Sequence, residues 1–206
     1  MPQALAKRRV EPPAAGKRDA ILRAAIDVFA ERGYFNAQVA DVARAAGVAA
    51  GTVYLYFHSK DDLLASIFEG TMRDAFQEWK TTLAAVDDPA ERLRRFASLH
   101  LGRLGRDRKL AVVFQVELRQ SIKFMERLSS TLLRDYLGQI REAIVDGQRR
   151  GVFRGDINPT LAAKVFFGAL DEMATNWILS RRKYALEADA ERVVDLFLNG
   201  ARGAAE

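Results

Sequence analysis

Residues 33–64 read GYFNAQVADVARAAGVAAGTVYLYFHSKDDLL and place short helical segments around two glycine turns. Four apolar residues in this stretch recur at i, i+3, i+4 and i+7: Val39, Val42, Ala43 and Ala46. This spacing is typical of the buried stripe of a short helix. Gly47 follows at the position where a helix commonly ends in the left-handed conformation, so we expect the first short helix to stop there.

The segment after Gly47 predicts a second short helix and the start of a third. Residues 50–57 fit the second helix, since only a short turn separates them from the first, as a crossed helix pair requires. Ser59 and Asp62 match a capping box ahead of the apolar run Leu63, Leu64, Ile67 and Phe68. The three segments together predict a helix-turn-helix, a motif that places its second helix in the major groove of DNA.

The motifs VADVARAAGV (39–48), GTVYLYF (51–57) and SKDDLL (59–64) resemble the N-terminal DNA-binding domain of the TetR family of repressors. The resemblance implies the following DNA contacts: Gln38, Arg44, Ala50, Gly51, Thr52, Tyr54, Leu55, Tyr56 and Lys60. In this reading Thr52 touches a base edge or a thymine methyl, and Lys60 meets phosphate. Two alternatives stay open at this point, namely that Tyr54 serves helix packing and that Lys60 is a free surface charge.

Two positions depart from the family pattern. Gln38 stands where many members have a threonine that caps the helix and touches phosphate, so that contact is either made by an amide or lost. Ala49 stands at a usual Ser or Asp capping position.

The composition favours a compact chain with a basic N-terminal part. Of the 206 residues 49% are hydrophobic and 29% are charged, and no apolar run approaches the roughly 20 residues of a membrane-spanning helix. No secretory signal is visible, so we expect a cytoplasmic protein without membrane association. Residues 1–60 hold nine Lys or Arg against five Asp or Glu. This excess suits the neutralisation of DNA phosphates, although a solvated basic face is the alternative.

Catalytic and metal chemistry find no support in the sequence. The chain has no cysteine, and His58 and His100 lie in separate predicted helical regions, so we expect neither a metal site nor a cofactor. No activated nucleophile is visible, and the acids at 117, 171 and 172 lack a recognisable acid–base partner motif. We therefore expect a binding protein, not an enzyme.

Helical periodicity continues to the end of the chain and predicts an all-α fold of about nine helices. Helix starts are indicated by Asp88 with Pro89, by Asp107 and by Asn158 with Pro159. We expect one helix from Lys17 to Gly33, a fourth from Ser59 to the low 80s, and a long one through Met125, Leu128, Tyr136 and Ile144. The predicted organisation is a flexible basic arm (1–16), a helix-turn-helix domain (17–62) and a ligand-binding and dimerisation domain (63–206).

The stretches VELRQS (116–121) and FFGALDEMATNWILSRRKYAL (166–186) resemble the TetR-type regulators that repress fatty-acid degradation genes and release DNA on binding long-chain acyl-CoA. The resemblance implies an acyl tunnel formed by Phe96, Leu99, Phe114, Leu118, Leu133, Tyr136, Leu137, Phe166, Leu170 and Met173. Basic groups suited to the coenzyme A phosphates are Arg103, Arg106, Arg108, Lys109 and Arg119. Ordinary core and solvated surface are the alternatives for these two sets.

Glu117 falls on the apolar stripe that begins at Leu110, so the sequence predicts a buried carboxylate that needs a partner. Arg119, Gln120 and Asn176 are candidates for that partner or for contact with the polar head of a ligand. Asp171 and Glu172 interrupt the apolar helix 161–179 in the same way. For these five residues a structural polar network and a ligand contact both remain open.

The resemblance further implies a homodimer that forms through the last two helices, residues 159–203, and binds a palindromic operator in double-stranded DNA. The recognition helices would lie about 34–36 Å apart, one turn of DNA, and the acyl-CoA effector would change that spacing. Two other readings stay open. One is a TetR-type repressor of an efflux or other operon that senses a different hydrophobic ligand, and the other is a DNA-binding protein without an effector.

Overall fold

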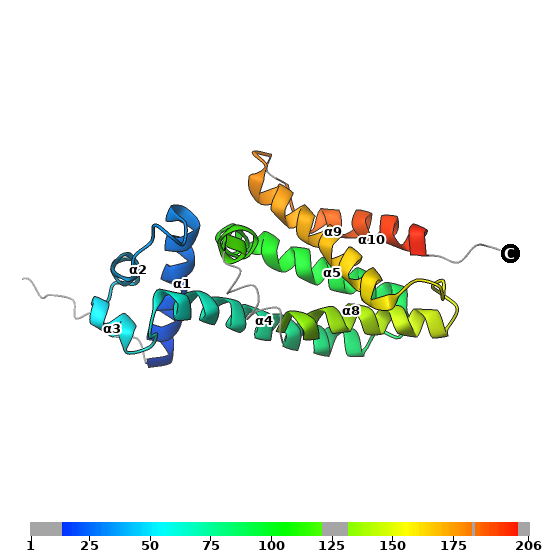
Figure 1. Cartoon of the computed structure of the whole chain (residues 1–206), viewed down its shortest axis with the longest axis horizontal. Helices are drawn as coiled ribbons and strands as arrows, with labels where there is room; N and C mark the ends of the chain where they lie inside the picture. Colours follow the sequence, from blue (N-terminus) through cyan, green and yellow to red (C-terminus); the bar gives the residue numbers. More distant parts are fainter. Residues whose placement is uncertain (1–13, 121–131, 183, 202–206) are drawn as a thin grey trace, which may run out of the picture.

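The computed structural model describes residues 14–120, 132–182 and 184–201 (Figure 1). Within these residues the chain forms nine α-helices and no strand, which confirms the all-α prediction. The helices are α1 (Ala14–Arg32), α2 (Val39–Ala46), α3 (Ala50–Tyr54), α4 (Lys60–Ala84), α5 (Pro89–Arg106), α6 (Arg108–Val112), α8 (Leu132–Arg149), α9 (Pro159–Leu179) and α10 (Ala188–Ala201). A π-helical turn η1 (Val113–Glu117) and a 3₁₀ turn η2 (Leu118–Gln120) continue from α6.

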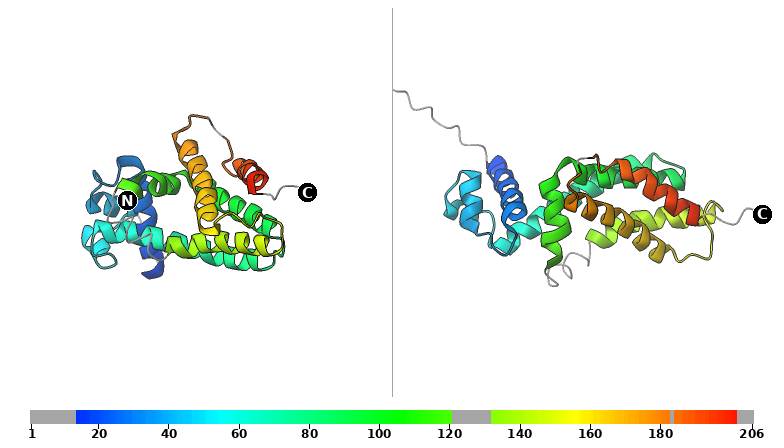
Figure 2. Two further views of the ribbon diagram at one scale, coloured as in Figure 1. Left: turned by 45° about the vertical axis from the view of Figure 1, so that its right-hand side comes forward. Right: turned by 90° about the horizontal axis from the view of Figure 1, so that it is seen from above.

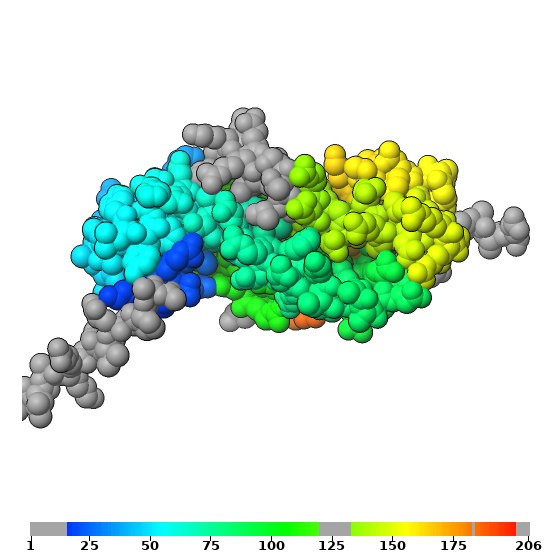
Figure 3. All heavy atoms as spheres, turned by 90° about the horizontal axis from the view of Figure 1, so that it is seen from below, coloured from blue at the N-terminus to red at the C-terminus, as the bar shows by residue number. Residues whose placement is uncertain are grey.

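The molecule is elongated, with α1, α2 and α3 forming a head at one end (Figure 1). Helix α4 runs from the head into the body, where it packs against α5 and α8, while α9 lies over α5 and α8 and α10 packs on α5 and α9. Seen from above, α6 and the turns that follow it stand between the head and the rest of the body (Figure 2). The space-filling view from below shows α4 running from the head along the body beside α8 (Figure 3).

The predicted helix starts are confirmed by their side-chain caps. Ser59 Oγ accepts the Asp62 N–H at 3.0 Å, and Asp88 and Asn158 cap α5 and α9 in the same way. The Asp62 carboxylate accepts the His58 N–H at 2.8 Å, one residue earlier than in a regular capping box. Asp107 likewise caps α6. These bonds satisfy amide groups that a helix start leaves without intrahelical acceptors.

Three boundaries differ from the sequence prediction. Helix α1 begins at Ala14 and not at Lys17, so part of the expected arm is helical, and residues 1–13 lie outside the described part. Helix α3 ends at Tyr54 instead of Phe57, because the chain turns so that Phe57 enters the head core with 1% of its surface exposed. The segment of the long helix through Met125 and Leu128 also lies outside the described residues.

One buried core extends from the head through α4 into the body. In the body its centre is aromatic, since the rings of Trp79, Phe96 and Tyr136 lie 3.8 to 4.9 Å apart between centroids. Trp79 comes from α4, Phe96 from α5 and Tyr136 from α8, so the cluster ties the helix that leaves the head to the middle of the body. No described helix combines the length and the apolar character needed to span a membrane.

Candidate functional site

The outer face of the head is formed by α3, which leaves Tyr54 54% and Leu55 82% exposed while Val53 is fully buried. Ala50 and Gly51 are exposed on the same helix, and Thr52 and Tyr56 are half-buried at its margin. A Cβ added at Gly51 would meet no heavy atom within 4 Å. Packing inside the head therefore does not require glycine at position 51. The absence of a side chain there leaves room for another molecule to approach the backbone closely.

Helix α2 presents Arg44 beside this face. Gln38 is the N-cap of α2, and its backbone N–H donates to Asp41 Oδ2 at 3.2 Å while its side chain is exposed. Arg44 Nη1 lies 3.1 Å from Asp41 Oδ1 and Arg32 Nη1 lies 2.9 Å from it. The Gln38 N–H, followed by these guanidinium groups, lowers the pKa of Asp41. Gln38 and Arg44 thus stand at the surface, as the phosphate contacts implied by the sequence require.

Lys60 has a different place from the one expected. Its Nζ donates to the carbonyl oxygens of Tyr34 at 2.7 Å and Ala37 at 2.9 Å. A third bond reaches the Phe35 carbonyl at 3.2 Å, and the ammonium lies 4.5 Å from the centroid of the Tyr34 ring. Because an ammonium has three donors, these bonds use all of them. Lys60 therefore secures the turn between α1 and α2, and we withdraw it from the phosphate contacts.

The body contains a cavity of about 280 Å³ between α4, α5, α8, α9 and the turns η1 and η2. It is lined by Phe68, Thr71, Met72, Ala75, Trp79, His100, Arg103, Leu104, Phe114, Gln115, Leu118, Arg119, Leu133, Tyr136, Phe167 and Asp171. The cavity thus brings together six of the residues expected to bind a ligand: Arg103, Phe114, Leu118, Arg119, Leu133 and Tyr136. Its lining is mostly apolar, with the polar groups concentrated on α5, η1, η2 and α9.

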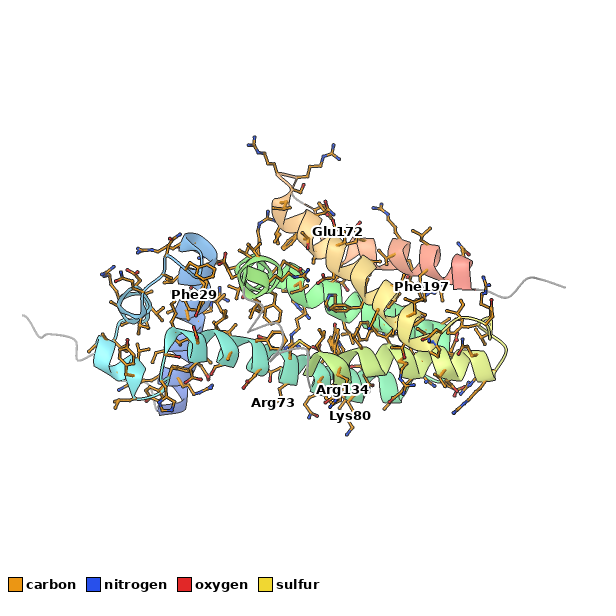
Figure 4. All side chains as sticks on the ribbon, in the orientation of Figure 1. Phe29, Arg73, Lys80, Arg134, Glu172 and Phe197 are labelled. Carbon is orange, nitrogen blue, oxygen red and sulfur yellow. The ribbon has the colours of Figure 1, made fainter. Side chains whose placement is uncertain are left out.

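Several expected tunnel residues lie elsewhere. Phe96, Phe166 and Leu170 are fully buried in the core and do not line the cavity. Phe166 packs against Phe197 of α10 with ring centroids 4.8 Å apart, and Figure 4 shows Phe197 between α9 and α10. The remaining three also lie outside the cavity. Leu99 packs on the core, Leu137 lines a neighbouring groove, and Met173 lines a groove between α9 and α10.

Two of the expected phosphate-binding groups make structural bonds instead. Arg108 donates to the carbonyl oxygens of Ile178 at 2.7 Å and Trp177 at 3.1 Å, because the end of α9 exposes carbonyls that attract a cation. Lys109 lies 2.6 Å from Glu31 Oε1 and 3.1 Å from Asp27 Oδ1, both on α1. Neither residue lines the cavity.

Two further candidates for ligand contact also lie apart from the cavity. Arg106 is exposed at the end of α5. Asn176 is exposed and donates to Glu172 Oε1 at 2.6 Å, on the face of α9 where Figure 4 shows Glu172. The side chain of Gln120 lies outside the described part of the structure.

Asp171 belongs to a polar network in the cavity wall. It accepts the Gln115 Nε2–H at 2.8 Å and a second bond from Arg119 Nη2. Thr175 Oγ1 lies 3.2 Å from Gln115 Oε1 and extends the network along α9. The two readings left open for Asp171 are therefore compatible, since the carboxylate is held by neighbours and also faces the cavity.

A second groove adjoins the cavity and is basic. It shares Leu133 with the cavity, and its other lining residues are Arg134, Leu137, Gly138, Arg141, Thr160, Ala163 and Lys164. Within the described residues no carboxylate forms an ion pair with Arg141 or Lys164. Figure 4 shows Arg134 near the edge of the body that also carries Arg73 and Lys80 of α4. Sequence reasoning missed this groove, although Arg134 and Arg141 stand one heptad apart on a single predicted helix.

The cavity wall reaches the head through Glu117, the last residue of η1. The side chain is 6% exposed, and Oε2 accepts the backbone N–H of Tyr34 at 2.6 Å. The prediction of a buried carboxylate is confirmed. Of the partners that the sequence left open, Arg119 pairs with Asp171 and Asn176 is exposed.

Exposed ion pairs surround the Glu117 bond where α1 rests on α6. Arg23 pairs with Asp107 and with Asp27, and the pKa of Asp27 is lowered by Arg23 first and by Lys109. The head therefore contacts the body both through a buried hydrogen bond and through charged groups at the surface.

Helices α9 and α10 leave apolar side chains uncovered on their outer faces. Leu161 is 59% exposed, Val165 55% and Leu196 78%, and they line a groove of about 640 Å³ between the two helices. Exposed apolar groups that gather in one place commonly mark an interface. In the part of the chain that the structure describes, no three His, Cys, Asp or Glu side chains gather as metal ligands.

Comparison with known proteins assigns both parts of the chain. Residues 21–67 match the family model of bacterial regulatory proteins of the tetR family, and residues 68–200 match the C-terminal region of YsiA-like protein. The fatty acid metabolism regulator protein of Bacillus subtilis is 34% identical over 180 residues, which cover 87% of this chain and 93% of that protein.

Two solved structures share the fold over most of the chain. The fatty acid degradation regulator FadR from Bacillus halodurans is 38% identical with a TM-score of 0.85, covering 93% of this chain and 98% of its own. FadR from Bacillus subtilis in complex with stearoyl-CoA is 33% identical with a TM-score of 0.84, covering 89% of this chain and 99% of its own.

Proposed function

Because the chain belongs to the TetR family of bacterial transcriptional regulators, which are not enzymes, we propose that it represses fatty-acid degradation genes and releases its operator on binding long-chain acyl-CoA. The observation that carries this proposal is the apolar cavity of about 280 Å³, which shares the lining residue Leu133 with a basic groove. A relative of the same fold holds stearoyl-CoA, a ligand with the same division into an apolar chain and a phosphate-bearing head.

The two surfaces suit the two parts of such a ligand. The acyl chain would occupy the cavity against Phe114, Leu118 and Leu133, where burial of each methylene contributes about 0.8 kcal/mol. The phosphates would lie along the groove beside Arg141 and Lys164, since these cations are not neutralised by carboxylates of the described residues. Leu133 borders both surfaces and marks the place where chain and head would join.

Ligand entry would act on the head through the cavity wall. A volume of about 280 Å³ is just below the range of small-molecule sites, roughly 300–1,000 Å³, so a long acyl chain has to widen the cavity. The wall that includes Phe114 and Gln115 is a π-helical turn, a rare conformation that recurs at functional sites. Displacement of this turn would move Glu117 and loosen its bond to Tyr34 in the head.

We propose that the protein acts as a homodimer formed through α9 and α10. A second copy would cover Leu161, Val165 and Leu196, which otherwise leave apolar surface in water. A two-fold axis through this face would present two α3 helices to a palindromic operator, with Thr52 toward the bases and Tyr54 and Arg44 toward the sugar-phosphate backbone. A change in the tilt of each head would then move the two α3 helices away from adjacent major grooves.

The proposal is tested by fluorescence anisotropy on labelled DNA from the protein's own upstream region, titrated separately with palmitoyl-CoA, free coenzyme A and palmitate. We expect release by palmitoyl-CoA alone, because only this molecule fills both the cavity and the groove. Binding of the DNA with no release by any of the three would refute the effector class and leave a TetR-type repressor of another hydrophobic ligand.

A further inference from the structure

Two buried polar atoms, both on residues that line the cavity, have no hydrogen-bond partner among the residues that the structure describes. They are Nε1 of Trp79, on α4, and Nε2 of His100, on α5. Both residues line the cavity, and Trp79 has 1% of its surface exposed. A buried N–H group without a partner costs about 1–3 kcal/mol, so two of them in one apolar cavity require an explanation.

The neighbouring tyrosine indicates which atoms are donors. Tyr136 Oη is hydrogen-bonded to His100 Nδ1. If the tyrosine donates its proton, the histidine carries its own proton on Nε2, and only that N–H lacks a partner. The opposite arrangement would leave both the tyrosine hydroxyl proton and the Nε2 lone pair without partners, so the first is favoured.

The ring is neutral in this environment. Burial lowers the pKa of His100 to about 4, although the Asp171 carboxylate opposes this effect. The indole N–H of Trp79 is a donor and cannot accept. The cavity lining thus includes two residues on adjacent helices that each carry an uncharged N–H without a partner, together with the apolar side chains of Met72, Ala75 and Phe167.

We infer that Trp79 and His100 form a subsite for a hydrogen-bond acceptor, an oxygen atom carried by the acyl part of the ligand. The inference rests on the proposed function, since it concerns the same cavity. Two sources supply such an oxygen: the thioester carbonyl, or a hydroxyl or oxo group further along the chain. A plain hydrocarbon would leave both donors without a partner and would bind more weakly than a ligand that places oxygen there.

The test compares ligand pairs that differ in one oxygen, by isothermal titration calorimetry on the full-length protein. The first pair is palmitoyl-CoA and its thioether analogue S-hexadecyl-CoA, which lacks the carbonyl. The second is 12-hydroxystearoyl-CoA and stearoyl-CoA. For the pair that supplies the acceptor we expect about threefold to tenfold tighter binding of the oxygen-bearing member, the effect of one hydrogen bond.

Variants assign the preference to the two donors. Trp79→Phe and His100→Phe each remove one N–H and keep an aromatic ring, so each should bring the affinity ratio of the responsive pair toward one. Phe167→Leu is the matched control, because Phe167 lines the same cavity without a polar atom and should change both affinities while keeping their ratio. Thermal melting confirms that each variant is folded.

The outcomes separate this inference from the proposed function. A preference in the first pair assigns the subsite to the thioester carbonyl, and one in the second assigns it to an oxygen within the chain. Equal affinities within both pairs of the wild-type protein, with acyl-CoA still bound, would overturn the subsite and leave the proposed function intact. Only water would then accept hydrogen bonds from the N–H groups of Trp79 and His100. Failure of every acyl-CoA to bind would refute the proposed function itself.

Discussion

Replacing Glu117 with glutamine would weaken the bond that joins the cavity wall to the head while keeping the shape of the side chain. In the wild-type protein Oε2 accepts the Tyr34 N–H at 2.6 Å, and the carboxylate is 6% exposed. The amide oxygen of glutamine can accept the same N–H, so the variant isolates the charge of the acceptor. Because the cavity is small in this arrangement, we take the bond to belong to the ligand-free, DNA-binding state.

The size of the effect follows from the bond. A hydrogen bond to a charged group contributes about 1.5–3 kcal/mol and a neutral one about 0.5–1.5 kcal/mol, so the substitution removes about 1–1.5 kcal/mol from the ligand-free state. This corresponds to a shift of about fivefold to tenfold toward the ligand-bound arrangement. The palmitoyl-CoA concentration that releases half of the operator should fall by about that factor, and operator affinity should weaken by no more than about tenfold.

The assay is operator release followed by fluorescence anisotropy, with Glu172→Gln as the control. Glu172 is also a glutamate on a helix of the body, but it is exposed, bonds to Asn176 and does not line the cavity, so its neutralisation should leave the release curve unchanged. A folded Glu117→Gln protein whose half-release concentration equals or exceeds that of the wild type would refute the coupling route.

Four further outcomes are expected. Lys60→Met should lower the free energy of unfolding by about 1–3 kcal/mol and with it the melting temperature, because three backbone carbonyls lose their donor. An unchanged melting curve would show that these bonds do not hold the turn, and Lys60 would again be a candidate for phosphate contact. Gly51→Ala should leave the melting temperature intact, since nothing lies within 4 Å of the new Cβ, yet weaken operator binding if the backbone approaches DNA there. Arg141→Ala should weaken the binding of palmitoyl-CoA more than that of palmitate in calorimetry, because in the proposal the groove holds the coenzyme A phosphates and not the acyl chain. The folded pKa of His100, about 4, lies below the unfolded value of 6.5, so the unfolded state binds more protons between them. The stability that this neutral histidine supplies, at most about 3 kcal/mol, is complete above pH 6.5 and lost as the pH falls toward 4. Urea unfolding between pH 6.5 and pH 4 should show a smaller loss of unfolding free energy for His100→Phe than for the wild-type protein.

The sequence predicted the head well because its signals are local. A cap such as Ser59 and a glycine such as Gly47, which adopts a φ of +69°, act on residues within one turn of themselves. The exposure of Tyr54 follows from a helix whose inner side carries Val53 in the core. Lys60 was misplaced because its acceptors lie on a turn more than 20 residues earlier, and a charge pattern carries no information on such a partner.

The cavity was predicted only in part, for a related reason. Helical spacing identifies the apolar face of a helix, but it does not separate a side chain that borders a cavity from one packed on every side. Phe114 and Phe96 look alike in sequence, although Phe114 lines the cavity and Phe96 does not. Arg108 and Lys109 bond instead to carbonyls on α9 and to carboxylates on α1. These partners are about 70 to 80 residues away in the sequence, so the local pattern could not indicate them.

The contact between head and body has two parts of unequal weight. The Arg23–Asp107 and Lys109–Glu31 pairs are exposed, and such pairs contribute about 0–1 kcal/mol and are screened by salt. The Glu117 bond is buried, so its loss costs more and is little affected by ionic strength. Glu117 also belongs to the turn η1, whose residues Phe114 and Gln115 line the cavity. A ligand can bias the head only through a contact that differs between its two arrangements, and Glu117 is the buried group placed to supply that difference.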